Sequence, residues 1–164
     1  MSPSSPRYAS VQILLHWLIF FLFAFNYIVS DDMGKALRVK LDGGTPDIFA
    51  ALVHPPVGFA ILVLTLLRLL ARARYKAPPL PEGNHPLLNR AAHIVHRSLY
   101  ALLVLVPVSG IAAWGIGIRT AGDVHEVLVN LTLAIVVLHA GAAIYHQFYL
   151  KDGLLNRMRP SRGD

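Results

Sequence analysis

The feature of this sequence that most constrains its fold is a set of four apolar stretches, each long enough to cross a bilayer. They cover approximately residues 11–29, 54–73, 97–118 and 125–149. A helix needs about 20 predominantly apolar residues to span the roughly 30 Å of bilayer hydrocarbon. Only 15% of the 164 residues are charged, against about a quarter in an ordinary soluble domain. We therefore expect one integral-membrane domain over residues 1–164, folded as an all-α four-helix bundle.

The positive charges are distributed unevenly between the connections of these four spans. If the spans alternate in direction, up-down-up-down, both chain ends lie on one side of the membrane. That side then carries eleven of the fifteen Lys and Arg residues. Because cytoplasmic segments are enriched in these residues, we expect both termini to be cytoplasmic. This topology accounts for the net charge of +6, and nucleic-acid binding is not expected.

The connections and helix ends are predicted from polar and turn-forming residues. Residues 30–53 are expected to form a polar connection. The second span is expected to begin near His54, with Pro55 and Pro56 in its first turn, where proline costs a helix least. The third helix is expected to begin around Leu88, before the membrane. The tail that follows the fourth span is polar and basic.

Two histidines on one face of the fourth span carry the strongest functional signal. His125 and His139 are fourteen residues apart. That spacing returns a helix to within about 40° of the same face, ~21 Å further along. An imidazole inside lipid is costly unless it is bound to a partner, and a metal is the plainest ligand for a neutral imidazole. The alternative is that these histidines only hydrogen-bond neighbouring helices.

Histidines in two other spans lie at matching depths. In the orientation given above, His54 and His125 open their spans at the periplasmic end, whereas His16 and His139 lie in the cytoplasmic half. Two facing histidines at each of two depths form two bis-imidazole sites. Such sites suit low-spin haem iron with both axial positions filled. The chain has no cysteine, so covalent c-type attachment is excluded and any haem must be held by coordination.

Three residues near these histidines are candidate contacts of a haem. Arg68 and Arg72, at the cytoplasmic end of the second span, could neutralise the carboxylates of an inner haem. Equally, they could be arginines that reach the interface and only fix the topology. Gly58, one turn after His54, could let a macrocycle pack flat against the backbone.

A third histidine of the fourth span, His146, follows His139 by seven residues and returns to nearly the same face. Periodicity does not say which of the two binds iron. Depth favours His139, because pairing His125 with His146 would separate the two irons by ~31 Å, the full apolar thickness. His146 would then lie near the cytoplasmic interface, where it could hydrogen-bond a quinone carbonyl, relay protons, or simply be solvated. His93 and His96 lie on the same side, with proton or quinone handling as their candidate role.

Four segments of the sequence carry a resemblance to known proteins. The segments are RYASVQILLHWL, HPPVGFAILVLTLLRLLAR, AAHIVHRSLYALLVLVPVSG and VHEVLVNLTLAIVVLHAGAAIYHQFYLKDGLLNRMRP. They resemble the bacterial cytochrome b561 family of inner-membrane di-haem proteins. The resemblance covers nearly the whole chain, and its most specific part is an H-x13-H-x6-H pattern followed by KDGLLNRM. The family is also related in architecture to the cytochrome b subunits that anchor formate dehydrogenases and nickel-iron hydrogenases.

The resemblance implies four helices in a bacterial inner membrane and two b-type haems. It implies axial ligation by His54 with His125 and by His16 with His139. Members of the family exchange electrons with ubiquinone. One branch resembles superoxide:ubiquinone oxidoreductases, in which superoxide gives its electron to the periplasmic-side haem. By that analogy His146 would lie at the quinone site.

The expected function is therefore transmembrane electron transfer between the quinone pool and a periplasmic donor. Fast capture of an anion such as superoxide needs a positively charged surface around the outer site. The periplasmic connections hold four cations against six carboxylates, so superoxide is only one candidate donor.

An alternative function is that of an anchor subunit for a periplasmic redox partner. An alternative of another class is a histidine-lined proton or metal-ion transporter, although only Glu126 at the membrane edge accompanies the histidines.

Overall fold

The structure, a computed structural model, describes residues 7–79 and 86–159. All regular structure in these two segments is helical, which agrees with the predicted all-α class. The elements are α1 (Ser10–Ile28), α2 (Met33–Leu41), α3 (Phe49–Tyr75), α4 (Pro86–Trp114), α5 (Arg119–Tyr145), a π-helical turn η1 (His146–Leu150) and a 3-10 helix η2 (Leu154–Met158).

Four of the helices are long and apolar enough to cross a membrane. They are α1, α3, α4 and the continuous helix made by α5 and η1, which runs over Arg119–Leu150. These four segments contain most of each predicted span, so the prediction of four candidate membrane helices is confirmed by length and composition.

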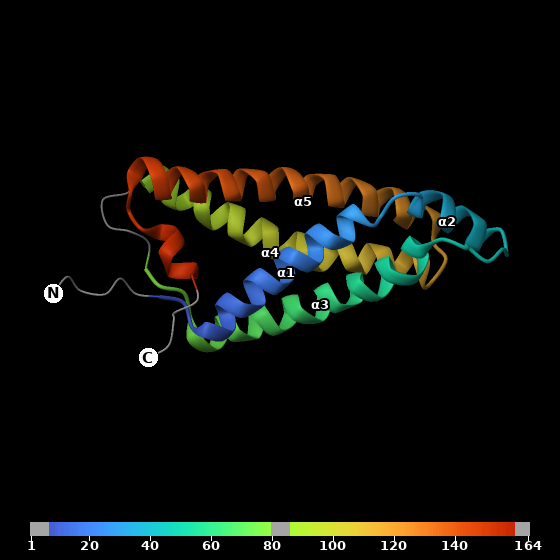
Figure 1. Ribbon diagram of the computed structural model, residues 1–164, viewed down its shortest axis with the longest axis horizontal. Helices are drawn as coiled ribbons and strands as arrows, with labels where there is room; N and C mark the ends of the chain where they lie inside the picture. Colours follow the sequence, from blue (N-terminus) through green and yellow to red (C-terminus); the bar gives the residue numbers. More distant parts are fainter. Residues whose placement is uncertain (1–6, 80–85, 160–164) are drawn as a thin grey trace.

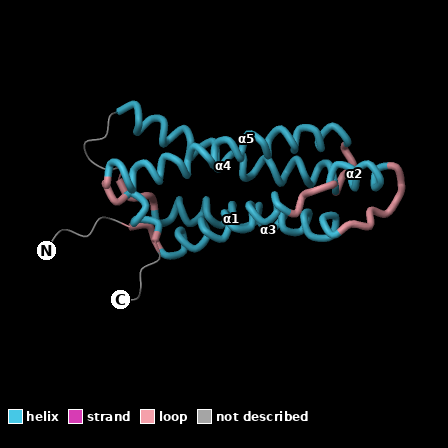
Figure 2. The backbone as a smooth tube through the Cα atoms, turned by 45° about the horizontal axis from the view of Figure 1, so that its top comes forward, coloured by secondary structure: helices cyan, strands magenta, loops and turns pink. Residues whose placement is uncertain are grey.

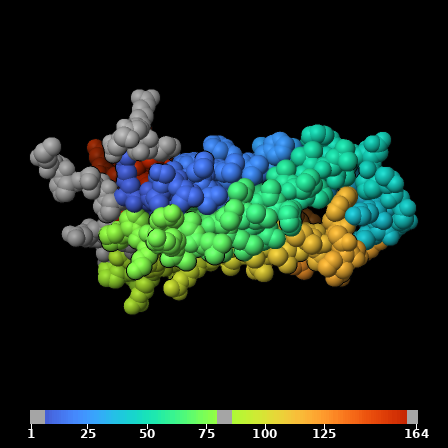
Figure 3. All heavy atoms as spheres, turned by 90° about the horizontal axis from the view of Figure 1, so that it is seen from below, coloured from blue at the N-terminus to red at the C-terminus, as the bar shows by residue number. Residues whose placement is uncertain are grey.

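The long helices form two layers, each made of two neighbours. Figure 1 and Figure 2 both show α1 beside α3 and α4 beside α5, and α3 also packs against α4. The start of α1 and the end of α5 lie at one end of this bundle, and α2 lies at the other. The space-filling view shows a rod with a hollow in its surface near α2, between the teal and orange segments (Figure 3).

The bundle buries few side chains completely, and its outer surface is apolar. Leu14, Ile28 and Leu52 are 65%, 73% and 76% exposed. Such an exterior is unfavourable in water and favourable against lipid tails. The buried hydrophobic side chains of the four long helices lie on the inner faces of α1, α3 and α4: Ile13, Leu15, Ile19, Ala50, Ile61, Ala71, Leu102, Val106 and Ala113.

The connection between the first two spans is more ordered than the sequence indicated. The prediction of a polar connection over residues 30–53 was wrong, because α2 forms within it and α3 already begins at Phe49. Lys40 fixes the end of α2: its Nζ donates to the Trp114 carbonyl oxygen at 2.6 Å and lies 4.4 Å above the Trp114 ring. A tertiary contact to α4 therefore stabilises a helix of only nine residues, which is too short to be stable alone in water.

Two other helix boundaries also differ from the prediction. Because α3 begins at Phe49, Pro55 and Pro56 lie inside the helix and not in its first turn. They lack the N–H groups that would bond to the preceding turn. The third span ends at Trp114, four residues before the predicted end, because Gly117 adopts a left-handed backbone (φ 87°) that stops the helix. The fourth helix then begins at Arg119, six residues earlier than expected.

Candidate functional site

The first predicted histidine pair faces across the bundle at the α2 end. His54 on α3 and His125 on α5 have ring centroids 6.1 Å apart, with the ring planes nearly perpendicular. His54 Nδ1–H donates to the Asn26 carbonyl oxygen at 3.2 Å, and His125 Nδ1–H donates to the Val106 carbonyl oxygen at 2.8 Å. Since carbonyl oxygens only accept, these bonds place the proton on Nδ1 and leave each Nε2 with its lone pair, the form that binds a metal.

The spacing of this pair fits one iron held between two imidazoles. With metal–nitrogen bonds of about 2 Å, two ring centroids on opposite sides of one metal are roughly 6 Å apart. Both histidines line a cavity of about 810 Å³ that extends under α2. Pockets that bind cofactors have volumes of about 300–1,000 Å³. The residues around this pair therefore fit a b-type haem.

Two glycines lie on the wall of this cavity, and the structure distinguishes them. A Cβ at Gly110 would lie 3.1 Å from Cε1 of His125, so this position must stay open for the ring. A Cβ at Gly58 would meet only Nδ2 of Asn26, at 3.7 Å, which is an ordinary contact. Gly58 thus lines the predicted site without being required by its protein neighbours. From the sequence, Pro107 and Gly110 suggest only a kink of the third span, so the role of Gly110 beside His125 was missed.

Two polar residues of the outer site were also missed. Ser109 Oγ donates to the Val106 carbonyl oxygen at 2.8 Å and lies 3.2 Å from His125 Nδ1. Asn26 is 6% exposed and lines the cavity, and its Oδ1 has no hydrogen-bond partner in the described part of the chain. A buried amide oxygen without a partner is unusual, and here it is available to a group inside the cavity. Both roles depend on contacts between helices, Ser109 with His125 and the Asn26 backbone with His54, which the sequence does not show.

The second predicted pair, His16 on α1 and His139 on α5, is also brought together. Their ring centroids are 6.3 Å apart, which again fits one metal between two imidazoles. A third ring joins them, because His96 on α4 lies 5.2 Å from His139, centroid to centroid. His93 of the same helix is exposed. The inner site therefore contains one more histidine than the predicted pair.

The two predicted arginines meet around one tyrosine, but they make different contacts. Arg68 donates from Nη1 to the Gln12 carbonyl oxygen at 2.6 Å and from Nε to the Tyr100 hydroxyl at 3.2 Å. Arg72 lies over the Tyr100 ring at 5.6 Å and makes no hydrogen bond to the described residues. Arg68 thus ties α1, α3 and α4 together, whereas Arg72 retains its donors for an anionic group such as a haem carboxylate.

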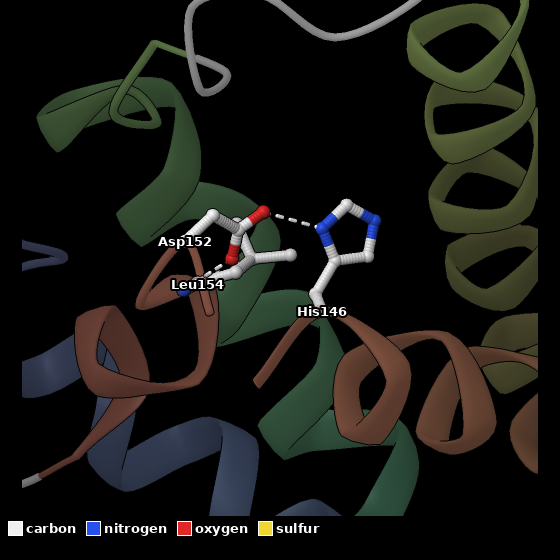
Figure 4. Close-up of polar contacts among 3 residues, drawn as sticks. All are labelled: His146, Asp152 and Leu154. Carbon is white, nitrogen blue, oxygen red and sulfur yellow. Dashed lines mark hydrogen bonds and ion pairs between the residues drawn. The ribbon is translucent and has the colours of Figure 1, made fainter. Parts of the chain in front are cut away.

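His146 is neither free nor fully exposed, because the chain folds back on it. After η1, Lys151 and Gly153 adopt left-handed backbones with φ of 53° and 71°. This turn brings Oδ2 of Asp152 to 2.5 Å from Nδ1 of His146, as Figure 4 shows. Oδ1 of Asp152 accepts from the Leu154 N–H at 3.0 Å. The side chains of His146 and Asp152 are 15% and 19% exposed. Nothing in the sequence predicts this pair.

The segment after this turn lies across the end of the bundle where α1 begins. Trp17 Nε1 donates to the Met158 carbonyl oxygen at 2.9 Å, and Arg157 Nη1 donates to the Pro79 carbonyl oxygen at 2.5 Å. The tail was predicted only as a polar and basic segment. In the structure the Met158 carbonyl holds it against α1, and Arg157 holds it against the segment that follows α3.

The chain is similar to known proteins over almost its whole length. Residues 7–161 match a family described as prokaryotic cytochrome b561. The chain is 38% identical over 157 residues to cytochrome b562 of Cereibacter sphaeroides, covering 96% of this chain and 98% of the relative. It is 29% identical to the probable superoxide oxidase CybB of Yersinia pestis (95% and 97% covered). It is 26% identical to cytochrome b561 homolog 1 of Escherichia coli (95% and 98% covered).

These matches confirm the resemblance found in the sequence motifs. They extend over all four candidate membrane helices and both facing histidine pairs. Such a match implies b-type haem as the cofactor and agrees with the donor sets described above. The chain belongs to the prokaryotic cytochrome b561 family.

Proposed function

We propose that this protein carries electrons across the bacterial inner membrane, from a one-electron donor on the periplasmic side to ubiquinone on the cytoplasmic side. Two b-type haems would each lie between two imidazoles, one bound by His54 and His125 and the other by His16 and His139. The observation that supports this most directly is the pair of ring separations, 6.1 and 6.3 Å, at two depths of one bundle.

The proposed orientation is up-down-up-down, with both termini in the cytoplasm. It is supported by the excess of Lys and Arg in the segments at the end where α1 begins and α5 ends. In that orientation α2 and the 810 Å³ cavity face the periplasm, and His146 and Asp152 face the cytoplasm. A donor in the periplasm would then meet the outer site first.

The protein would contribute position and electrostatics, while bound haem would supply iron that accepts and releases one electron at a time. Asn26 and Val106 would keep the rings of His54 and His125 in one tautomer and one orientation through their carbonyl oxygens. The side chains of Thr65 and Thr132 are fully buried, Thr132 midway between His125 and His139 on α5, and they would help to exclude water from the interior. Arg72 would neutralise a carboxylate at the inner site.

The arrangement of possible ligands supports electron transfer more than ion transport. Within residues 7–79 and 86–159, no group of three or more His, Cys, Asp or Glu side chains is placed to surround a metal ion. The rings of His54 with His125 and of His16 with His139 instead have the separations that axial coordination of a haem requires, with His96 beside the second pair. We therefore propose electron transfer and not a histidine-lined transporter.

The test is to purify the protein in detergent, measure haem per chain by the pyridine haemochrome method, and add a short-chain ubiquinone to the reduced holoprotein. We expect two b-type haems per chain and reoxidation of both. One haem per chain after full reconstitution would contradict the two-site proposal. Two haems that ubiquinone does not reoxidise would contradict the quinone part alone.

A further inference from the structure

We propose that Asp152 is the positioning residue of a proton-delivering pair with His146, which serves quinone reduction at the end of the bundle opposite α2. This inference rests on the proposed function, because it names the residues that would supply protons to the quinone. It starts from a contact that the sequence does not predict: a carboxylate oxygen 2.5 Å from His146 Nδ1.

The backbone holds this pair in one geometry. One oxygen of Asp152 accepts the Leu154 N–H and the other faces His146, so the carboxylate has little freedom to rotate. The left-handed backbones of Lys151 and Gly153 bring the Asp152 carboxylate to the Nδ1 edge of the ring. Both side chains are more than four-fifths buried, so water competes little for their contact. In Figure 4 the second ring nitrogen points away from Asp152, and it has no hydrogen-bond partner among the described residues.

The chemistry that this geometry supports is proton transfer through His146 Nε2. Reduction of a quinone to its hydroquinone takes two electrons and two protons. The electrons would come one at a time from the periplasmic donor, and the protons from cytoplasmic water. A protonated His146 would give its Nε2 proton to a quinone oxygen, while the Asp152 carboxylate keeps the Nδ1 proton in place and stabilises the cationic ring. Water would then reprotonate Nε2 for the second transfer.

Within residues 7–79 and 86–159, no second carboxylate forms an ion pair with the ring of His146. The described ring neighbour of His146 is Tyr145, 6.3 Å away between centroids, and Tyr149 stacks on Tyr145 at 4.9 Å. Both tyrosines are exposed. Among the described residues, Asp152 is the only acidic side chain paired with His146. Removing its charge should therefore slow proton delivery without changing the number of haems.

The experiment follows reoxidation of the dithionite-reduced holoprotein by short-chain ubiquinone, using the haem absorbance in a stopped-flow instrument. We expect D152N to retain both haems and their spectra but to react about 10- to 100-fold more slowly. D152E, which restores the charge on a longer side chain, should recover part of the rate. D47N serves as the matched control, because Asp47 is exposed in the loop before α3, and its rate should equal that of the wild type.

Two further variants separate proton delivery from mere anchoring of the tail. R157Q removes the bond from the tail to the Pro79 carbonyl and should change the rate less than twofold. The double variant H146Q/D152N should be no slower than H146Q alone, because Asp152 would act only through His146. The proposal is overturned if D152N reacts at the wild-type rate, if R157Q is slowed as much as D152N, or if the double variant is slowed by the product of the single effects. Wild-type protein that ubiquinone does not reoxidise would instead refute the proposed function.

Discussion

The outer and inner histidine pairs have nearly the same spacing but are held by different means. At the outer pair, the backbone carbonyls of Asn26 and Val106 fix both rings through Nδ1. At the inner pair, His139 lies between His16 and His96 and contacts both rings edge to face. Main-chain atoms cannot move without moving a helix, whereas side-chain contacts can be replaced. The outer site should therefore depend on a few positions, and the inner site on a larger group of side chains.

The two regions also differ in charge. The outer cavity is lined by four carboxylates and two guanidinium groups, from Asp31, Asp32, Asp123, Glu126, Arg38 and Arg119. The inner pair has Arg68 and Arg72 at Tyr100. Positive charge favours the reduced state of a nearby iron and negative charge disfavours it. The inner haem should therefore have the higher potential, so that electrons pass from the outer to the inner site.

Replacing His125 by alanine should produce the largest difference between the two sites, because it removes a ligand from the outer site only. The variant loses one axial ligand and the hydrogen bond to Val106, so we expect the outer haem to be lost and the inner haem to remain. Haem per chain should fall from two to one, as measured by the pyridine haemochrome method. H146A is the control and should keep both haems. Loss of a haem from H146A would mean that His146, and not His139, is the second axial ligand on α5.

Replacing Gly110 by alanine should weaken the outer site without removing a ligand. The new Cβ would lie 3.1 Å from Cε1 of His125, and overpacking of this kind costs about 1–3 kcal/mol. We expect the outer haem to be lost to excess apomyoglobin roughly 5- to 100-fold faster, while the inner haem is retained. G141A is the matched control on α5, because a Cβ there would meet no described atom within 4 Å. Equal loss of haem from both variants would show that Gly110 has no special role.

Removing the charge of Arg72 should reduce the electrostatic difference between the two regions. Arg72 makes no hydrogen bond to the described residues, so R72Q is expected to disturb the fold little. We expect the lower positive charge to reduce the potential of the inner haem by about 30–60 mV, with 59 mV equal to tenfold for one electron. A redox titration followed by optical spectroscopy measures both haems at once. A shift of the outer haem alone would contradict the assignment of Arg72 to the inner site.

The sequence was sufficient to predict the histidine pairs, because helical periodicity and membrane depth determine which imidazoles can face each other. His54 with His125 and His16 with His139 were paired in this way, and the structure brings both pairs together. The spans were predicted from the length of their apolar stretches. Apolar length alone identifies a membrane helix, whatever its tertiary contacts.

The features that the sequence did not predict all depend on contacts between distant segments. The helix α2 is stabilised by Lys40 on Trp114, 74 positions away in the sequence. Gly110 looks like a kink residue until the ring of His125 is placed against it. Asp152 reaches His146 only because Lys151, a non-glycine residue, adopts a left-handed backbone. Such a conformation has no reliable sequence signature.

The smallest expected effect concerns the charge at the outer cavity. Superoxide, one of the candidate donors considered from the sequence, is an anion, and the net acidic lining should slow its approach. E126Q removes one negative charge and should speed haem reduction by superoxide about twofold at low salt. The difference should shrink as salt screens the charge. Stopped-flow mixing of superoxide with the oxidised holoprotein measures this rate, and D47N, which lies outside the cavity lining, controls for net charge. If superoxide does not reduce the wild-type protein at any salt concentration, the acidic lining instead favours a neutral or cationic donor.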